Sequence, residues 1–97
     1  QSHVKQEVYS KYYQLNLHMD ISHISKYEFN YCLSSILPLP TVLVRLCSLH
    51  LSNHETYGAI TLFIRQYSHL DIPSLRSLSL TDATISQIRF FLNRLSF

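Results

Sequence analysis

Leucines recur along the chain in a fixed pattern, and apolar and polar residues alternate at the end of each copy. Two copies of L-x-x-L-x-L lie 29 positions apart (75 − 46 = 29), at 46–51 and 75–80. A weaker copy at 12–17 begins with Tyr12 and lies 34 positions before the copy at 46–51 (51 − 17 = 34). Alternation with a period of two is typical of a strand with one buried face. The pattern predicts strands near 13–18, 47–52 and 76–81.

The segments between these strands have helical periodicity. Ser25 and Glu28 have the spacing of a capping box, in which a hydroxyl and a carboxylate satisfy free amides at the start of a helix. An apolar face at i, i+3, i+4 and i+7 follows, formed by Phe29, Cys32, Leu33 and Ile36. We predict helices near 25–36, 55–68 and 83–95. Residues 1–11 are expected to form the helix of a preceding or capping unit.

The spacing from strand to helix is the same in each copy. Twelve positions (29 − 17 = 12) separate the last strand leucine from an apolar helix residue, in the pairs Leu17 and Phe29, Leu51 and Phe63, and Leu80 and Leu92. Each unit is therefore a strand followed by a helix, which places parallel strands in one sheet with helices on its other side. A single unit cannot bury its apolar face, so the units must stack.

These residues resemble the leucine-rich-repeat family, whose pattern is L-x-x-L-x-L-x-x-N/C-x-L. The segment 72–80, IPSLRSLSL, resembles the start of such a repeat, and the long repeats are most similar to those of F-box and leucine-rich-repeat proteins. The resemblance implies an α/β solenoid fragment of about three strand–helix units, one domain over 1–97 with repeats from about residue 12. It implies the substrate-recognition part of an F-box-type ubiquitin ligase receptor.

The sequence departs from the family at the position of the conserved Asn or Cys. Asp20, His54 and Ala83 stand there instead. The family's side chain satisfies backbone groups in the turns, so its replacement implies irregular turns between strand and helix.

The residues between the buried leucines are expected to form the binding surface, on the concave face of the sheet. They fall in three predicted columns, one residue from each strand: Gln14, Ser48 and Ser77; Asn16, His50 and Ser79; His18, Ser52 and Thr81. All nine are polar and lack a permanent charge. Such a surface suits a protein or peptide partner.

Composition excludes several other functions. The net charge is only +2 and the eight Lys and Arg are scattered, so we expect no nucleic-acid partner. No motif for nucleophilic or phosphate chemistry is present, so we expect neither an enzyme nor a cofactor. His18, Asp20 and His23, or His50 and His54, fall short of a zinc ligand set, and we expect no metal. The sequence has no membrane segment, and its two unpaired cysteines favour the cytoplasm or nucleus.

Two alternatives give different folds. The segment from Val42 to Leu51 resembles the elongin-binding element of SOCS-box proteins, which requires a helix over 46–51. A small all-helical interaction domain is the other. The alternation of Ser48, His50 and Ser52 favours a strand. The last helix has no polar cap, so we expect the fragment to self-associate through uncapped ends.

Overall fold

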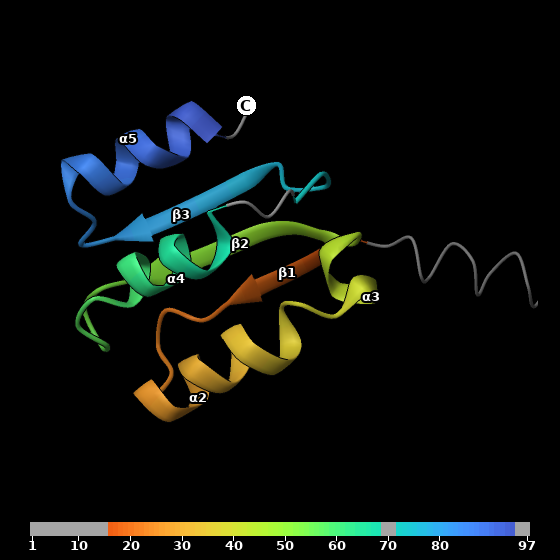
Figure 1. Ribbon diagram of the computed structural model, residues 1–97, viewed down its shortest axis with the longest axis horizontal. Helices are drawn as coiled ribbons and strands as arrows, with labels where there is room; N and C mark the ends of the chain where they lie inside the picture. Colours follow the sequence, from red (N-terminus) through yellow and green to blue (C-terminus); the bar gives the residue numbers. More distant parts are fainter. Residues whose placement is uncertain (1–15, 69–71, 95–97) are drawn as a thin grey trace, which may run out of the picture.

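A computed structural model describes residues 16–68 and 72–94, and it has three parallel strands that alternate with helices (Figure 1). The strands pair in the order β1-β2-β3. The elements in chain order are β1 (Leu17–Asp20), α2 (Lys26–Tyr31) continued by a π-helical turn (Cys32–Ile36), α3 (Pro40–Leu43), β2 (Leu46–Ser52), α4 (Ala59–Tyr67), β3 (Ser77–Thr81) and α5 (Ile85–Arg94). The predicted α/β class with parallel strands is confirmed, and the all-helical alternative is wrong.

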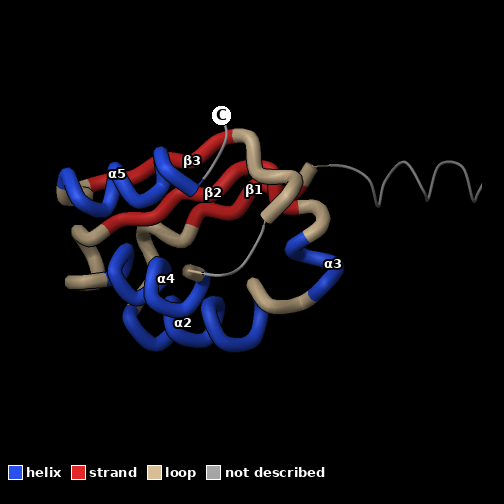
Figure 2. The backbone as a smooth tube through the Cα atoms, turned by 45° about the horizontal axis from the view of Figure 1, so that its top comes forward, coloured by secondary structure: helices blue, strands red, loops and turns tan. Residues whose placement is uncertain are grey.

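The central strand β2 carries the core. Leu46, Leu49 and Leu51 are 0% exposed, and they pack under apolar side chains of the helices, among them Phe29 and Phe63. Figure 2 shows α2 and α4 side by side beneath the strands, and in Figure 1 the helices are spread more widely than the strands. The leucines of one face of the sheet therefore supply its stability, and none of the helices in residues 16–68 and 72–94 covers the opposite face.

The first strand lies further along the chain than predicted. The observed strand is Leu17–Asp20 rather than 13–18, and positions 13–15 of the prediction fall outside the described residues. His18 pairs with Ser48, whereas the leucine pattern paired Gln14 with Ser48, a difference of four positions. The cause is that Met19, which pairs with Leu49, occupies a leucine position of the pattern, whereas the pattern placed Leu15 there. Four is an even number, so the predicted inward and outward facing of β1 still holds.

The helices that follow the strands begin at different kinds of cap. Ser25 and Glu28 form the predicted capping box at α2. Helix α4 starts at Ala59 rather than near 55, because Gly58 adopts φ 74° at its N-cap, a left-handed conformation that glycine permits. At α5, the Thr84 hydroxyl accepts from the Gln87 amide at 3.2 Å.

The twelve-residue spacing fails in the last unit. Phe29 and Phe63 are buried as expected, but Leu92 is 67% exposed and Phe91, at 6%, takes the core position. Phe91 packs on Phe63 with ring centroids 6.0 Å apart. Asp82 at φ 56° turns the chain before α5, so the helix presents a residue one position earlier to the core. The predicted helix at 1–11 lies outside the described residues.

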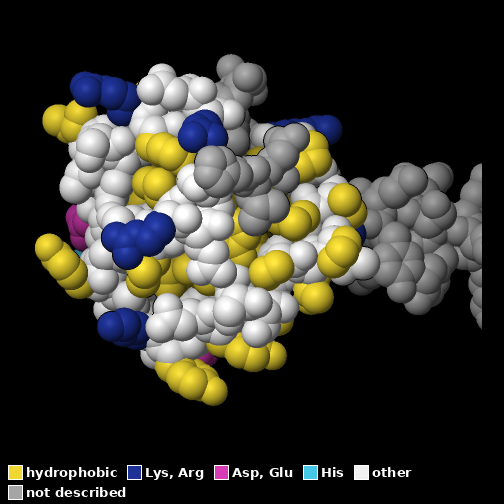
Figure 3. Space-filling model, in the orientation of Figure 1, with side chains coloured by type: hydrophobic (Ala, Val, Ile, Leu, Met, Phe, Trp, Pro, Cys, Tyr) yellow, Lys and Arg dark blue, Asp and Glu magenta, His cyan; other side chains and the backbone are white. Residues whose placement is uncertain are grey.

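A buried hydroxyl in the helix layer, that of Tyr67, has a hydrogen-bond partner. Burial raises the pKa of Tyr67 to about 12, so its hydroxyl remains protonated and donates to the Leu33 carbonyl. This bond joins α4 to the turn after α2. In the described part of the chain, no helix has the length and apolar character required to cross a membrane. Figure 3 shows that hydrophobic side chains nevertheless reach the surface at several places on the helix side.

Truncating the central core should cost more than truncating the edge. Leu49→Ala should lower the free energy of unfolding by about 2–5 kcal/mol, because Leu49 is 0% exposed. Leu78→Ala should cost less, since Leu78 in β3 is only partly buried. Ser79→Ala, on the exposed face, should change stability by under about 0.5 kcal/mol. Urea unfolding of the three variants tests the order. A larger cost for Ser79→Ala than for Leu49→Ala would mean that the strand facing is inverted.

Candidate functional site: the open face of the sheet

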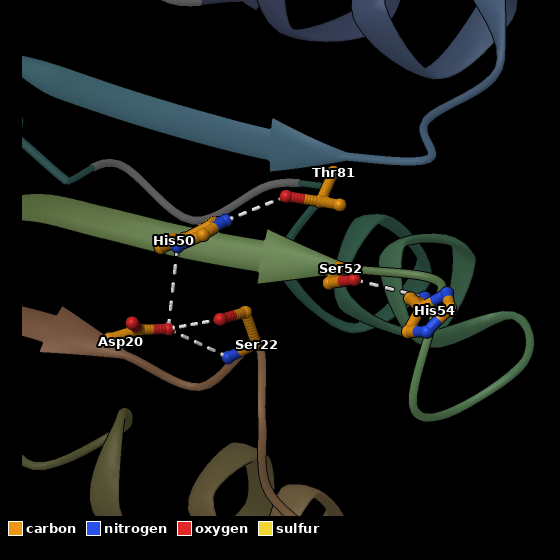
Figure 4. A network of polar contacts seen from close by, with 6 residues as sticks. All are labelled: Asp20, Ser22, His50, Ser52, His54 and Thr81. Atoms are coloured by element: carbon orange, nitrogen blue, oxygen red, sulfur yellow. Dashed lines mark hydrogen bonds and ion pairs between the residues drawn. The ribbon is translucent and has the colours of Figure 1, made fainter.

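The three strands point a row of polar side chains away from the helices. In the observed register, His18 lies beside Ser48 and Ser77, and Asp20 lies beside His50 and Ser79. Figure 4 looks onto this face, and the helices lie behind the strands. All of these side chains except Ser48 and His50, which are half-buried, are exposed. The open face is therefore a polar surface to which each strand contributes at least two side chains.

The nine predicted positions do not all lie on this surface. Gln14 is outside the described residues, and Asn16 is exposed but precedes β1. Ser52 is buried, at 3% exposed, because the chain turns at the end of β2 and the amide of His54 donates to the Ser52 hydroxyl at 2.9 Å. The predicted exposure of Ser52 is therefore wrong. The other six, His18, Ser48, His50, Ser77, Ser79 and Thr81, are brought together on one face.

A chain of polar contacts crosses the three strands at their carboxyl ends (Figure 4). The Asp20 Oδ1 atom lies 3.5 Å from His50 Nδ1, and His50 Nε2 lies 2.8 Å from the Thr81 hydroxyl. Either His50 Nε2 or the Thr81 hydroxyl can be the donor of this hydrogen bond. The two contacts hold the imidazole between Asp20 and Thr81 at the centre of the face.

The turn after β1 stabilises the negative charge on Asp20. Both the backbone amide and the hydroxyl of Ser22 donate to Asp20 Oδ1, the amide at 2.9 Å. The Ser22 hydrogen bonds are the largest cause of a lowered pKa of Asp20, and the nearby His50 and His23 add to it. A second pair, His54 Nδ1 and Asp82 Oδ2 at 3.3 Å, lies beyond the strand ends. The carboxyl end of the sheet therefore combines two exposed carboxylates with two imidazoles that lie close to them.

The order carboxylate, imidazole, hydroxyl is also found in hydrolase triads. Here Thr81 is exposed on an open face. A hollow lies on the helix side between α4 and α5, lined by residues such as Thr61, Arg65 and Gln87, and it contains neither His50 nor Thr81. The likeness to such triads rests on the order of these three groups alone.

Other side chains in this region lack the geometry of a reactive or metal-binding site. Cys47 is buried, and its sulfur lies 3.7 Å from His18 Nδ1 and 3.8 Å from Nε2, almost equally far from both nitrogens. Over residues 16–68 and 72–94, no three His, Cys, Asp or Glu side chains are close enough together to hold a metal ion.

The connection between units depends on Asn53. Its amide nitrogen donates to the Asp82 carbonyl and to Gln87 Oε1, each at 3.0 Å, and its Oδ1 accepts from the Ile60 amide at 3.0 Å. The leucine pattern assigned this role to position 54 and expected it to be lost at His54. The side chain one position earlier satisfies the turn and joins two units. Asn53 directly precedes the position that the family pattern assigns to this role, so the pattern alone does not identify it.

Comparisons with protein-family models, with curated proteins and with solved structures found no match to this chain.

Replacing Asn53 should weaken the junction of the second and third units. Asn53→Ala leaves the Ile60 amide and the Asp82 carbonyl without this partner, which should cost about 1–3 kcal/mol of stability. Urea unfolding measures the cost, with the neighbouring exposed residue His54 changed to Ala as a control. Equal stability of Asn53→Ala and the parent would show that water replaces the amide in full.

The pKa of Asp20 gives a second test. Its folded value is lowered, so its contribution to stability is present above the unfolded pKa and is lost as pH falls through the folded pKa. Ser22→Ala should raise the pKa of Asp20 and reduce this contribution. His50→Ala should raise it less, because Ser22 is the larger cause. Carboxyl titration by NMR measures both. A smaller effect of Ser22→Ala than of His50→Ala would contradict the assignment.

Proposed function

We propose that this chain is a protein-binding module that uses the open face of its sheet, within a leucine-rich-repeat solenoid. The observation that carries the proposal is the contrast between the two faces. One is closed by helices over fully buried leucines, and over the other, which presents mainly polar side chains, the described residues place no helix. Parallel sheets are usually covered on both faces, so a polar face of this kind favours a binding role.

The chemistry of the face favours a peptide-like partner. Its hydroxyls and imidazoles both donate and accept hydrogen bonds, which matches backbone amides and polar side chains. The fixed charges on its carboxyl end, Asp20 and Asp82, are negative. Phosphate recognition needs clustered Lys and Arg, and the outward positions of the described strands carry none. The proposed partner is therefore a protein surface with polar or basic groups.

The helices are spaced more widely than the strands, and this spacing supports the solenoid part of the proposal. Strands lie closer together than the helices that follow them, so a stack of such units curves with the strands on the inside (Figure 1). The likeness of the leucine pattern to F-box and leucine-rich-repeat proteins adds the substrate-recognition part of a ubiquitin ligase receptor as the specific role. That role rests on the residues of the pattern alone.

The elongin-type alternative lacks the element it needs. It requires a helix that presents Leu43, Cys47 and Leu51 to a partner, but Leu46–Ser52 is a strand. Cys47 and Leu51 are buried in it. No second function is proposed.

Two arginines placed on the open face should abolish capture of the partner. Ser48→Arg/His50→Arg changes the centre of the face, and its matched control, Ser35→Arg/Tyr57→Arg, adds the same charge at exposed positions on the helix side. Quantitative mass spectrometry of proteins captured from a cell lysate compares the two with the parent chain, and circular dichroism verifies the fold of each. We expect one set of proteins to be lost from the face variant and retained by the control.

The opposite pattern would contradict the proposal. If the face variant is folded and captures the same proteins as the parent, the open face is not the binding surface. Loss from the control alone would move the surface to the helix side.

A further inference from the structure

The two edge strands of the sheet differ in how well they are protected against further pairing. Strand β1 carries His18 and Asp20, and its pairing with β2 is broken by a register shift. Charges and irregular pairing are the usual means by which an edge strand avoids pairing with another chain. Strand β3, SLSLT, has no charged residue and no proline, and its register is unbroken from Ser77 to Thr81. Of the two edge strands in residues 16–68 and 72–94, β3 is therefore the one without these protections.

The third unit is also less well covered than the second. Leu49 and Leu51 in β2 are 0% exposed, whereas their register partners in β3, Leu78 and Leu80, are partly exposed. On α5, Ile88 is 42% exposed and Leu92 is 67% exposed. Figure 1 places α5 beside β3 at this end of the sheet. An apolar strip on a helix thus lies next to an unpaired strand edge.

When two copies of this edge segment run in opposite directions, residues of matching kind lie opposite one another. The segment from Arg76 to Asp82 reads cation, hydroxyl, leucine, hydroxyl, leucine, hydroxyl, anion. In an antiparallel pair centred on Ser79, position n lies opposite position 158 − n, since 79 + 79 = 158. Leu78 then faces Leu80 of the second copy, and Ser77 faces Thr81. Arg76 and Asp82 flank the paired strands, so Arg76 of one copy lies at the same end as Asp82 of the other, where Asp82 turns the chain and also pairs with His54.

From these features we infer that β3 pairs with β3 of a second copy, antiparallel and about a two-fold axis at Ser79. The pair joins the two sheets into one of six strands. A two-fold axis normal to the sheet keeps both α5 helices on the same face, where Ile88 and Leu92 cover the leucines of the junction. Matched apolar and hydroxyl cross-strand pairs each stabilise such a ladder. A closed two-fold pair is also the commonest arrangement of identical chains. The inference does not depend on what the open face binds.

Other arrangements fit the residues less well. A parallel pair of two β3 strands in the same register places Arg76 against Arg76 and Asp82 against Asp82. Pairing of β3 with β1 of a second copy would use the protected edge. The charges at the two ends of β3 therefore select the antiparallel pair of like strands.

A single cysteine tests the axis directly. Opposite residues of an antiparallel pair have Cα atoms about 4.5–5.5 Å apart, within reach of a disulfide. Ser79→Cys should form a covalent dimer under mild oxidation, with the 79–79 link identified by mass spectrometry. His18→Cys, the matched control on the other edge strand, should not. Both variants carry Cys47→Ser, because the Cys47 sulfur lies 3.7 Å from His18 Nδ1 and would otherwise form a disulfide with a cysteine at position 18. Dimerisation of the unmodified chain is followed by sedimentation velocity.

Charge exchange tests the register and does not involve the core. Arg76→Glu and Asp82→Lys each place like charges at the same end of the pair and should weaken dimerisation about tenfold, equal to about 1.4 kcal/mol. An equal mixture of the two variants restores both attractive pairs and should dimerise like the parent. Circular dichroism of each variant alone shows whether it is folded.

Each of the following results would overturn the inference. A monomer at every concentration, a series of dimers, trimers and larger species, or no restoration in the mixture would each exclude the two-fold pair. So would equal cross-linking of Ser79→Cys and His18→Cys.

Discussion

The structure depends on one constraint, which is that a strand with alternating leucines must have its apolar face covered and both edges paired. Only β2 meets the whole requirement, with β1 and β3 on its two edges and the helices over Leu46, Leu49 and Leu51, all of which are 0% exposed. Each buried leucine contributes on the order of 2 kcal/mol from its burial. β1 and β3 are paired on one edge only, and their inward side chains are correspondingly half-buried. Burial, rather than local strand preference, therefore ranks the three units.

The same constraint explains how much of the fold the sequence predicts. Leucine alternation identifies β2 and β3 within one residue, because their leucines are buried and their intervening residues are polar. In β1, Met19 performs the role of a leucine, and a pattern restricted to leucine passes over it. If the alternation of inward and outward residues is continued from Leu17 and His18 to Met19 and Asp20, it gives the observed register. The register error was four residues, and the facing was preserved because four is even.

The site was harder to predict than the fold for a different reason. The outward positions of β2 and β3 follow directly from the inward ones, and five of those six positions are on the open face. The Asp20–His50–Thr81 contacts depend on the register of β1, so the four-residue error removed Asp20 from the predicted surface. The burial of Ser52 and the bridge by Asn53 depend on how the chain turns after β2. Turns are decided by a few hydrogen bonds, and periodicity contains no information about them.

The two edge strands of the sheet, β1 and β3, differ in their charge and in the regularity of their pairing with β2. Asp20 on β1 is held ionised by Ser22 and lies on an edge whose pairing is already irregular, so addition of a strand there would desolvate a stabilised carboxylate. On β3 the charges lie only at the two ends, outside the segment that would pair, and they are of opposite sign. An edge strand with a neutral centre and opposite charges at its two ends repels neither another strand nor a copy of itself that runs in the opposite direction. Within the described residues, the distribution of charge therefore protects the β1 edge against addition of a strand and gives the β3 edge no such protection.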